Sequence, residues 1–128
     1  MVKGVLHAED AKAARDHGAD GVCVSNHGGR VFDSAPASIE MLAPVVDAVG
    51  KDMTVIWDGG VRRGADVLKA MAIGAHAVMT CRATLYGAAA AGAEGAALAL
   101  EILRNEIDTG MAMLGVQSLR ELDRGFLR

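Results

Sequence analysis

The sequence has few of the features that direct a protein out of the cell or into a membrane. Cysteine is scarce: Cys23 and Cys81 are the only two, and both lie in apolar stretches. Two cysteines are too few for a disulfide framework, so we expect a reducing, cytoplasmic environment. No run approaches 18 strongly apolar residues, and the first residues show no charged segment followed by an apolar one. We therefore expect no integral membrane segment and no secretory signal.

The sequence also lacks a block of charge of one sign. It has 13 Lys and Arg against 16 Asp and Glu, for a formal net charge of −3. The two signs are interspersed, so no broad basic face for nucleic acid is expected. The two cysteines form no zinc-binding pattern, and we expect no metal site. What remains is a chain of 128 residues, 52% of them hydrophobic, which is the composition of one globular domain.

Short, partly β-branched segments alternate with helical patterns along the chain. Buried strands are predicted at 21–24, 54–57 and 77–79. Helices are predicted at 9–17, 38–49 and 65–73, followed by Gly18, Gly50 and Gly74 as C-terminal caps. The Ala-rich stretch 83–103, which three glycines interrupt, predicts two or three further helices and then a polar tail.

A faint internal repeat supports this alternation. Residues 10–19 match residues 66–75 at Asp, Ala, Gly and Ala, at an offset of 56 residues. Half of that offset is close to the roughly 31 residues per βα unit of an eight-stranded barrel. Apolar strands with helices between them predict a parallel sheet, which belongs either to a doubly wound fold or to part of a (β/α)8 barrel. Periodicity alone leaves both open.

Polar residues gather where each predicted strand ends. The strings are Ser-Asn-His-Gly-Gly-Arg at 25–30, Asp-Gly-Gly-Val-Arg at 58–62 and Cys-Arg at 81–82, and Lys3 stands at an equivalent position. In parallel α/β folds this edge of the sheet binds ligands. Each residue also has a simpler interpretation, because His27 could be a solvated loop residue, Asp58 a helix cap and each arginine a surface charge.

These strings resemble the FMN-dependent α-hydroxy-acid dehydrogenase and oxidase family, of the glycolate oxidase, L-lactate dehydrogenase and mandelate dehydrogenase type. Lys3-Gly4 and Leu85-Tyr86-Gly87 extend the resemblance over nearly the whole chain, in the family's order. It implies an α/β fold, the C-terminal part of a (β/α)8 TIM barrel with about strands 5 to 8 and their helices. Residues 1–128 would then be a partial FMN hydroxy acid dehydrogenase domain without the first half of the barrel. Trp57 is expected to fill the barrel interior.

The resemblance implies catalytic roles for three residues. His27 corresponds to the base that takes a proton from the α-carbon or the hydroxyl of the substrate. Asp58 corresponds to the aspartate that hydrogen-bonds this histidine, fixing its tautomer and stabilising the imidazolium. Arg30 corresponds to the clamp on the substrate carboxylate, so that His27 and Arg30 together bind substrate.

The resemblance also implies a cofactor site. Lys3 would stabilise the negative charge on the reduced flavin, and Ser25 would contact the flavin ring. The remaining cofactor-binding residues, which would include the phosphate pocket, are Asp58, Gly59, Gly60, Arg62, Cys81 and Arg82. Cys81 replaces the glycine that the family usually has before the phosphate-binding arginine, and its Cβ is expected to weaken FMN binding.

The function implied is FMN-dependent oxidation of a small 2-hydroxy acid to the 2-oxo acid. The electron acceptor could be oxygen, a quinone or a protein, and homo-oligomers are common in the family. Two alternatives stand beside this function: another FMN- or phosphate-binding barrel enzyme, which would not need His27 and Arg30, and a non-catalytic fragment without the first half of the barrel. We expect the chain alone to be weakly active or inactive.

Overall fold

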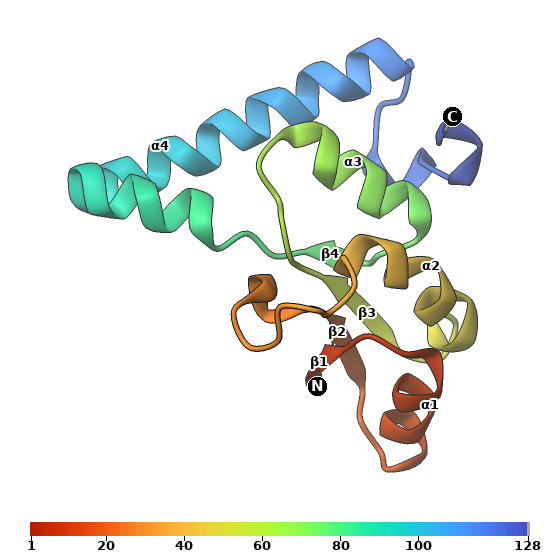
Figure 1. Ribbon diagram of the computed structural model, residues 1–128. Helices are drawn as coiled ribbons and strands as arrows, with labels where there is room; N and C mark the ends of the chain where they lie inside the picture. The colour runs from red at the N-terminus through yellow and green to blue at the C-terminus, as the bar shows by residue number, and fades with distance from the viewer. Residues whose placement is uncertain (128) are drawn as a thin grey trace. The chain divides into compact units, whose positions relative to one another are not determined.

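The computed structural model describes residues 1–127 and contains one four-stranded parallel sheet (Figure 1). The strands are β1 (Val2–Val5), β2 (Gly21–Val24), β3 (Thr54–Trp57) and β4 (Ala77–Val78), in the spatial order β1-β2-β3-β4. The structure confirms the bounds predicted for β2 and β3, and β4 is one residue shorter than predicted. The segment around Lys3 is a paired strand.

The predicted helices are also present. They are α1 (Ala8–Asp16), α2 (Ser38–Val49), α3 (Gly64–Ile73) and α4 (Arg82–Leu114), with short 3-10 helices at His27–Gly29, Leu119–Glu121 and Arg124–Phe126. Helix α2 has the predicted bounds, whereas α1 and α3 each begin one residue earlier than predicted. The chain divides into two compact units, of which the first contains residues 1–59 and 73–79 and the second contains residues 60–72 and the chain from 80 onward.

The core of the first unit lies on one face of the sheet. Val22 and Val24 of β2 pair in register with Val55 and Trp57 of β3, and all four side chains are buried. Helices α1 and α2 contact each other and the strands, so both crossover helices cover this same face (Figure 1). A doubly wound sheet would carry helices on both faces and reverse its strand order, so this arrangement is an arc of a barrel.

Trp57 does not lie where it was expected, in the barrel interior. In the parallel register Trp57 follows Val55 by two residues, and its indole nitrogen reaches Ser38 at the start of α2. Trp57 therefore lies on the helix-covered face of the sheet and does not fill the barrel interior. The opposite face carries Cys23 and its register partners Lys3 and Ile56.

The second unit is helical. Leu68 and Ala72 of α3 form its core with Leu122 and five partly buried apolar residues, which are Met71, Ile107, Met111, Val116 and Leu119. Gly110 of α4 lies so close to Leu68 that a Cβ there would meet the leucine side chain. Burial of each such leucine stabilises the fold by about 1.5–3 kcal/mol.

Helix α4 extends beyond residue 103, the predicted end of the Ala-rich helical stretch. Ala91 and Gly92 have non-helical backbone angles, so α4 consists of two helical segments, in agreement with the lower predicted number. Gly87 and Gly95 face each other across this kink with no room for a Cβ, which lets the two segments approach closely. The second segment continues to Leu114, because apolar residues recur at helical spacing beyond residue 103, and the polar tail is correspondingly shorter.

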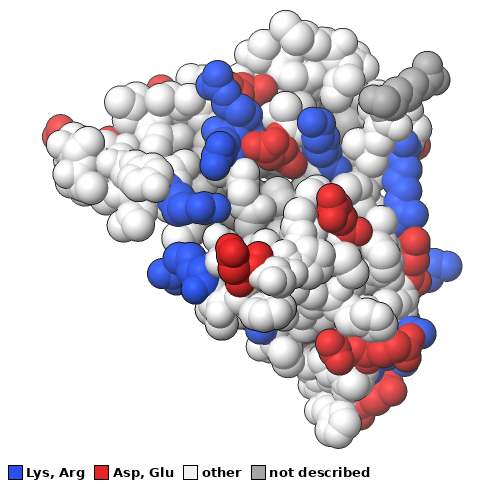
Figure 2. Space-filling view, viewed as in Figure 1, with Lys and Arg blue, Asp and Glu red and all other residues white. Residues whose placement is uncertain are grey.

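Charges of both signs are interspersed on the face drawn in Figure 2. Ion pairs join residues of opposite charge, since Arg15 pairs with Asp16 at 3.0 Å and with Asp52 at 3.3 Å. None of the helices within residues 1–127 combines the length and the apolar character needed to cross a bilayer.

Candidate functional site

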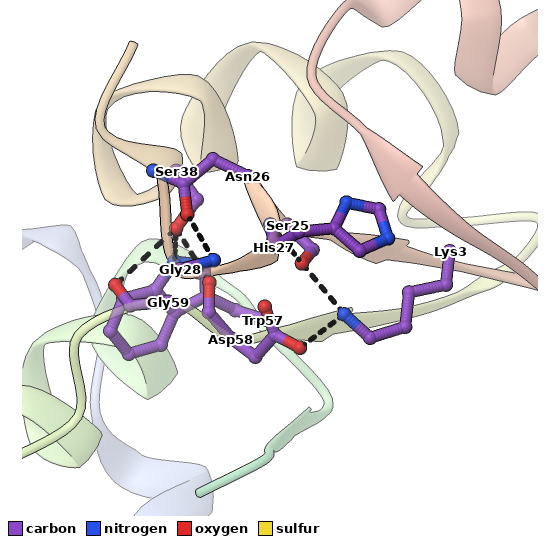
Figure 3. Close-up of polar contacts among 9 residues, drawn as sticks. All are labelled: Lys3, Ser25, Asn26, His27, Gly28, Ser38, Trp57, Asp58 and Gly59. Carbon is purple, nitrogen blue, oxygen red and sulfur yellow. Dashed lines mark hydrogen bonds and ion pairs between the residues drawn. The ribbon is translucent and has the colours of Figure 1, made fainter. Parts of the chain in front are cut away.

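Three of the predicted site residues meet at the carboxyl edge of the sheet (Figure 3). Lys3 lies in β1, Ser25 follows β2 and Asp58 follows β3. The Lys3 ammonium lies 2.5 Å from Asp58 Oδ2 and donates to Ser25 Oγ at 2.7 Å. Asp58 is largely buried, with 15% of its side chain exposed, whereas 42% of the Lys3 side chain is exposed. The result is a fixed cation that still has a solvent-facing side.

The loop after β2 presents His27 in a left-handed turn. His27 has a φ of 54°, and Gly28 and Gly29 continue the turn with φ of 71° and 74°. The backbone N–H of His27 donates to Ser25 Oγ at 3.1 Å, and that of Gly28 donates to Asn26 Oδ1 at 3.0 Å. Positive φ is uncommon for a residue with a side chain, although histidine adopts it more readily than most. The side chains of Ser25 and Asn26 therefore hold His27 in this conformation.

The His27 imidazole lies over Gly4, a residue to which the sequence alone assigned no role. A Cβ on Gly4 would come within 2.7 Å of His27 Cε1. Gly4 thus leaves the space that the ring occupies, and His27 itself is exposed to solvent. The Lys3-Gly4 pair in the sequence was the available signal.

The expected hydrogen bond from the His27 ring to the Asp58 carboxylate is not formed in the part of the chain that the structure describes. The Asp58 carboxylate pairs with Lys3, while the imidazole ring lies against Gly4. The Lys3 ammonium, a charged donor, thus takes the place at Asp58 that was expected for the histidine. The catalytic roles assigned to Asp58 and His27 remain predictions.

The Asp58 turn is supported by Ser38, to which the sequence alone assigned no role, and by Trp57, which was expected inside the barrel. The buried hydroxyl of Ser38 donates to the Asp58 carbonyl at 2.5 Å and accepts the indole N–H of Trp57 at 3.0 Å (Figure 3). Gly59, with a φ of 109°, passes so close to Ser38 Oγ and Asn26 Oδ1 that a Cβ would clash. A buried tryptophan at the end of a strand needs a partner for its N–H, and this was the signal in the sequence.

Cys23 lies beside this group on the same face of the sheet as Lys3. Its side chain is almost completely buried. Burial, with a further contribution from the negative charge of Asp58, raises the pKa of the Cys23 thiol to about 11. The thiol therefore stays protonated at neutral pH and is a core residue rather than a nucleophile.

Arg30 follows the 3-10 helix at His27–Gly29 and is exposed. Within residues 1–127 its guanidinium has no ion-pair partner. It is available for an anion from outside the chain, and its role as a carboxylate clamp remains a prediction.

The second unit carries most of the residues expected at the phosphate. Arg62 and Arg82 are exposed, and neither side chain has an ion-pair partner among residues 1–127. Gly60 has a φ of 109° and open space where a Cβ would point. The buried hydroxyl oxygen of Thr80 has no hydrogen-bond partner within the described chain. Unpaired guanidinium groups and an unsatisfied hydroxyl suit the oxygens of a phosphate.

Cys81 is exposed and is the N-cap residue of α4, to which its side chain contributes no capping bond. The other expected phosphate residue, Gly59, belongs to the first unit. The backbone N–H of Arg62 is already bonded to Asp66, at 2.9 Å, as part of the start of α3. Any contribution of Arg62 to an anion would therefore come from its side chain.

Comparison with known proteins gives a consistent result. The family model described as FMN-dependent dehydrogenase matches residues 1–128. The chain is 46% identical to 2-hydroxyacid oxidase 1 of Mus musculus, covering 100% of this chain and 35% of that protein. It is 48% identical to pre-mycofactocin synthase of Mycolicibacterium smegmatis, covering 95% of this chain and 31% of that protein.

The solved structures agree with these matches. A soluble mutant of the membrane-associated (S)-mandelate dehydrogenase from Pseudomonas putida superimposes with a TM-score of 0.94 and 46% identity, over 98% of this chain and 35% of that one. This likeness and the consecutive strand order confirm the predicted fold, part of a (β/α)8 barrel. The chain spans about a third of the length of the curated relatives it matches.

Proposed function

The chain belongs to the FMN-dependent dehydrogenase family, and from this premise we propose that it forms part of an enzyme that oxidises a small 2-hydroxy acid to the 2-oxo acid with FMN. One observation carries the proposal. Lys3, Ser25 and Asp58 form a connected polar group at the carboxyl edge of three adjacent strands, and the exposed His27 follows the middle strand. This is the edge where parallel barrels bind their ligands.

FMN, when bound, would accept the two electrons that leave the substrate. Arg62 and Arg82 would hold its phosphate through guanidinium forks, and Gly60 would let the backbone approach. Lys3 would supply positive charge for the electron-rich flavin, a role for which Asp58 and Ser25 hold its ammonium in place.

His27 would move the proton. An imidazole nitrogen is basic enough near neutral pH to take the proton from the α-carbon or the α-hydroxyl of the substrate. Arg30 would bind the substrate carboxylate through two parallel N–H donors. Both side chains are exposed on one short loop, which supports their access to the same small molecule.

The similarity to pre-mycofactocin synthase supports a second candidate, an FMN-dependent barrel enzyme with a different substrate. Such an enzyme would keep the groups proposed for the cofactor, including Lys3 and Arg82, and would not require His27 and Arg30 for a hydroxy acid. Because the chain spans about a third of its relatives, we also propose that the chain by itself turns over slowly or not at all. We propose oxygen, a quinone or a protein as the electron acceptor.

Titration of FMN into the purified chain, followed by visible absorbance and fluorescence, tests the cofactor part. We expect saturable binding that Arg82→Ala weakens by about ten-fold or more, since a charge-assisted hydrogen bond to phosphate is lost. Arg104→Ala, which removes another exposed arginine of α4, is the matched control and should bind like the wild type. A folded chain that binds no FMN would refute this part of the proposal.

Assay of lactate, glycolate and mandelate oxidation tests the substrate part. Any turnover should be lost in His27→Gln while FMN affinity is unchanged. His17→Gln is the control, because His17 is an exposed histidine whose ring bonds to the Ala13 carbonyl of its own helix. Turnover that survives His27→Gln would refute the role of His27 as the base.

We also propose a cytoplasmic location, on the basis of the low cysteine content. The relatives differ in this respect, since one is described as a peroxisomal oxidase and another as a membrane-associated dehydrogenase. Cell fractionation with an antibody against the chain would test the location.

A further inference from the structure

The Ser38 hydroxyl has one hydrogen to donate, and its surroundings determine where that hydrogen goes. Trp57 Nε1 donates to Ser38 Oγ at 3.0 Å, and both side chains are buried. Since the oxygen already accepts this bond, the hydroxyl hydrogen is directed to a carbonyl. The Asp58 carbonyl lies at 2.5 Å, whereas that of Gly59 is farther away, at 3.5 Å.

The backbone of Asp58 is thereby held on both sides. Its N–H donates to the Val24 carbonyl at 3.1 Å, which continues the ladder between β2 and β3. Its C=O accepts the Ser38 hydroxyl. With both peptide groups fixed, the direction of the Asp58 Cα–Cβ bond is fixed as well, and from this position the carboxylate meets the Lys3 ammonium.

Close packing reinforces this arrangement on the far side of the turn. A Cβ on Gly59 would clash with Ser38 Oγ and would lie 3.0 Å from Asn26 Oδ1, so the turn leaves room only for glycine. The same Asn26 oxygen accepts the N–H of Gly28, and the Asn26 amide donates to the Pro36 carbonyl at 3.2 Å. The turn after β3 and the loop after β2 therefore share one set of contacts (Figure 3).

We propose that Ser38 and Trp57 are positioning residues of the candidate flavin site. The Trp57 N–H orients the Ser38 hydroxyl, this hydroxyl fixes the Asp58 peptide, and Asp58 in turn holds the Lys3 ammonium at the edge of the sheet. The consequence for cofactor binding rests on the proposed function. The positioning of Lys3 does not rest on the proposed function, because it concerns the Lys3–Asp58 ion pair in the chain by itself.

A double-mutant cycle tests, without FMN, whether Ser38 positions Lys3 through Asp58. Within residues 1–127, Ser38 and Lys3 are joined by no hydrogen bond, and Asp58 is the residue that bonds to both, so a purely structural serine would give additive effects with Lys3→Met. Positioning predicts that Ser38→Ala and Lys3→Met are coupled by about two-fold or more in the equilibrium constant for unfolding. Val49→Ala, a truncation at a fully buried position of α2, should be additive with Lys3→Met. Additivity of Ser38→Ala with Lys3→Met would overturn the inference.

Trp57 provides a direct signal, because it is the only tryptophan in the sequence. Its indole N–H gives a single NMR resonance, whose exchange with solvent should be at least ten-fold faster in Ser38→Ala than in the wild type and in Val49→Ala. Trp57→Phe removes the N–H donor and keeps an aromatic ring of smaller volume, so it replaces Ser38→Ala in the cycle if that variant fails to fold. Unchanged exchange in folded Ser38→Ala would contradict the first step.

FMN titration then separates this inference from the proposed function. We expect Trp57→Phe to weaken FMN binding by roughly three- to ten-fold, the range for one hydrogen bond, and Ser38→Thr, which retains the hydroxyl, to restore near wild-type affinity relative to Ser38→Ala. A wild-type chain that binds no FMN while the cycle shows coupling would refute the proposed function and leave the positioning role standing. FMN binding that is unchanged in Trp57→Phe, or a cycle without coupling, would refute the positioning role.

Discussion

Replacing Gly59 with alanine should destabilise the first unit more than replacing its neighbour Gly60. Both glycines have a φ of 109°, a conformation that a residue with a side chain rarely adopts. Holding alanine there costs about 1–3 kcal/mol at either position. The two sites differ in their surroundings, since a Cβ on Gly60 meets nothing within 4 Å, whereas one on Gly59 clashes with Ser38 Oγ and lies 3.0 Å from Asn26 Oδ1.

The difference between the two variants isolates this close approach. Overpacking of a tight site costs about 1–3 kcal/mol, so Gly59→Ala should lower the free energy of unfolding by about 2–6 kcal/mol in total and Gly60→Ala by about 1–3 kcal/mol. Equilibrium urea unfolding, followed by the fluorescence of Trp57 for the first unit and by circular dichroism for the whole chain, measures both values.

A third variant tests the assigned cause. Ser38→Ala removes the oxygen that the new Cβ would meet, so Gly59→Ala should cost less in the Ser38→Ala background than in the wild type. Equal losses for Gly59→Ala and Gly60→Ala, or an undiminished cost in the Ser38→Ala background, would refute the close packing of the Asp58 turn.

Three further predictions concern other parts of the chain. Burial raises the pKa of Cys23 from 9.0 to about 11, so the folded chain retains a proton that the unfolded chain loses between these pH values. The free energy of unfolding should therefore fall by up to about 2–3 kcal/mol between pH 9 and 11. Urea unfolding of Cys23→Val across that range should lack this fall. Glu106 accepts the N–H of Gly64 at 2.7 Å at the start of α3. Glu106→Gln should therefore lower the stability by about 1–2 kcal/mol in thermal unfolding. An equal loss in Glu101→Gln, an exposed control, would contradict the capping role. Cys81→Gly, which restores the family's usual residue, should tighten FMN binding in a fluorescence titration, and equal affinity would remove Cys81 as an obstacle to the phosphate.

The sequence by itself determined most of the secondary structure and the edge at which the polar residues gather. Strands β2 and β3 and helix α2 have the predicted bounds because each is a local pattern: β-branched residues that fit a buried strand, or apolar residues at helical spacing before a glycine. The polar strings after the strands could be predicted to meet, since the carboxyl ends of parallel strands share one edge.

Only the tertiary structure decided which atoms meet at that edge. Lys3 and Asp58 are 55 positions apart, and their ion pair depends on the pairing of β1, β2 and β3. Trp57 could not be assigned to either face of the sheet from its own segment, and its hydrogen bond to Ser38 depends on where α2 packs. Local periodicity reports which side chains are buried, whereas the identity of their partners is set by contacts between segments that are distant in the sequence, which a local pattern does not contain.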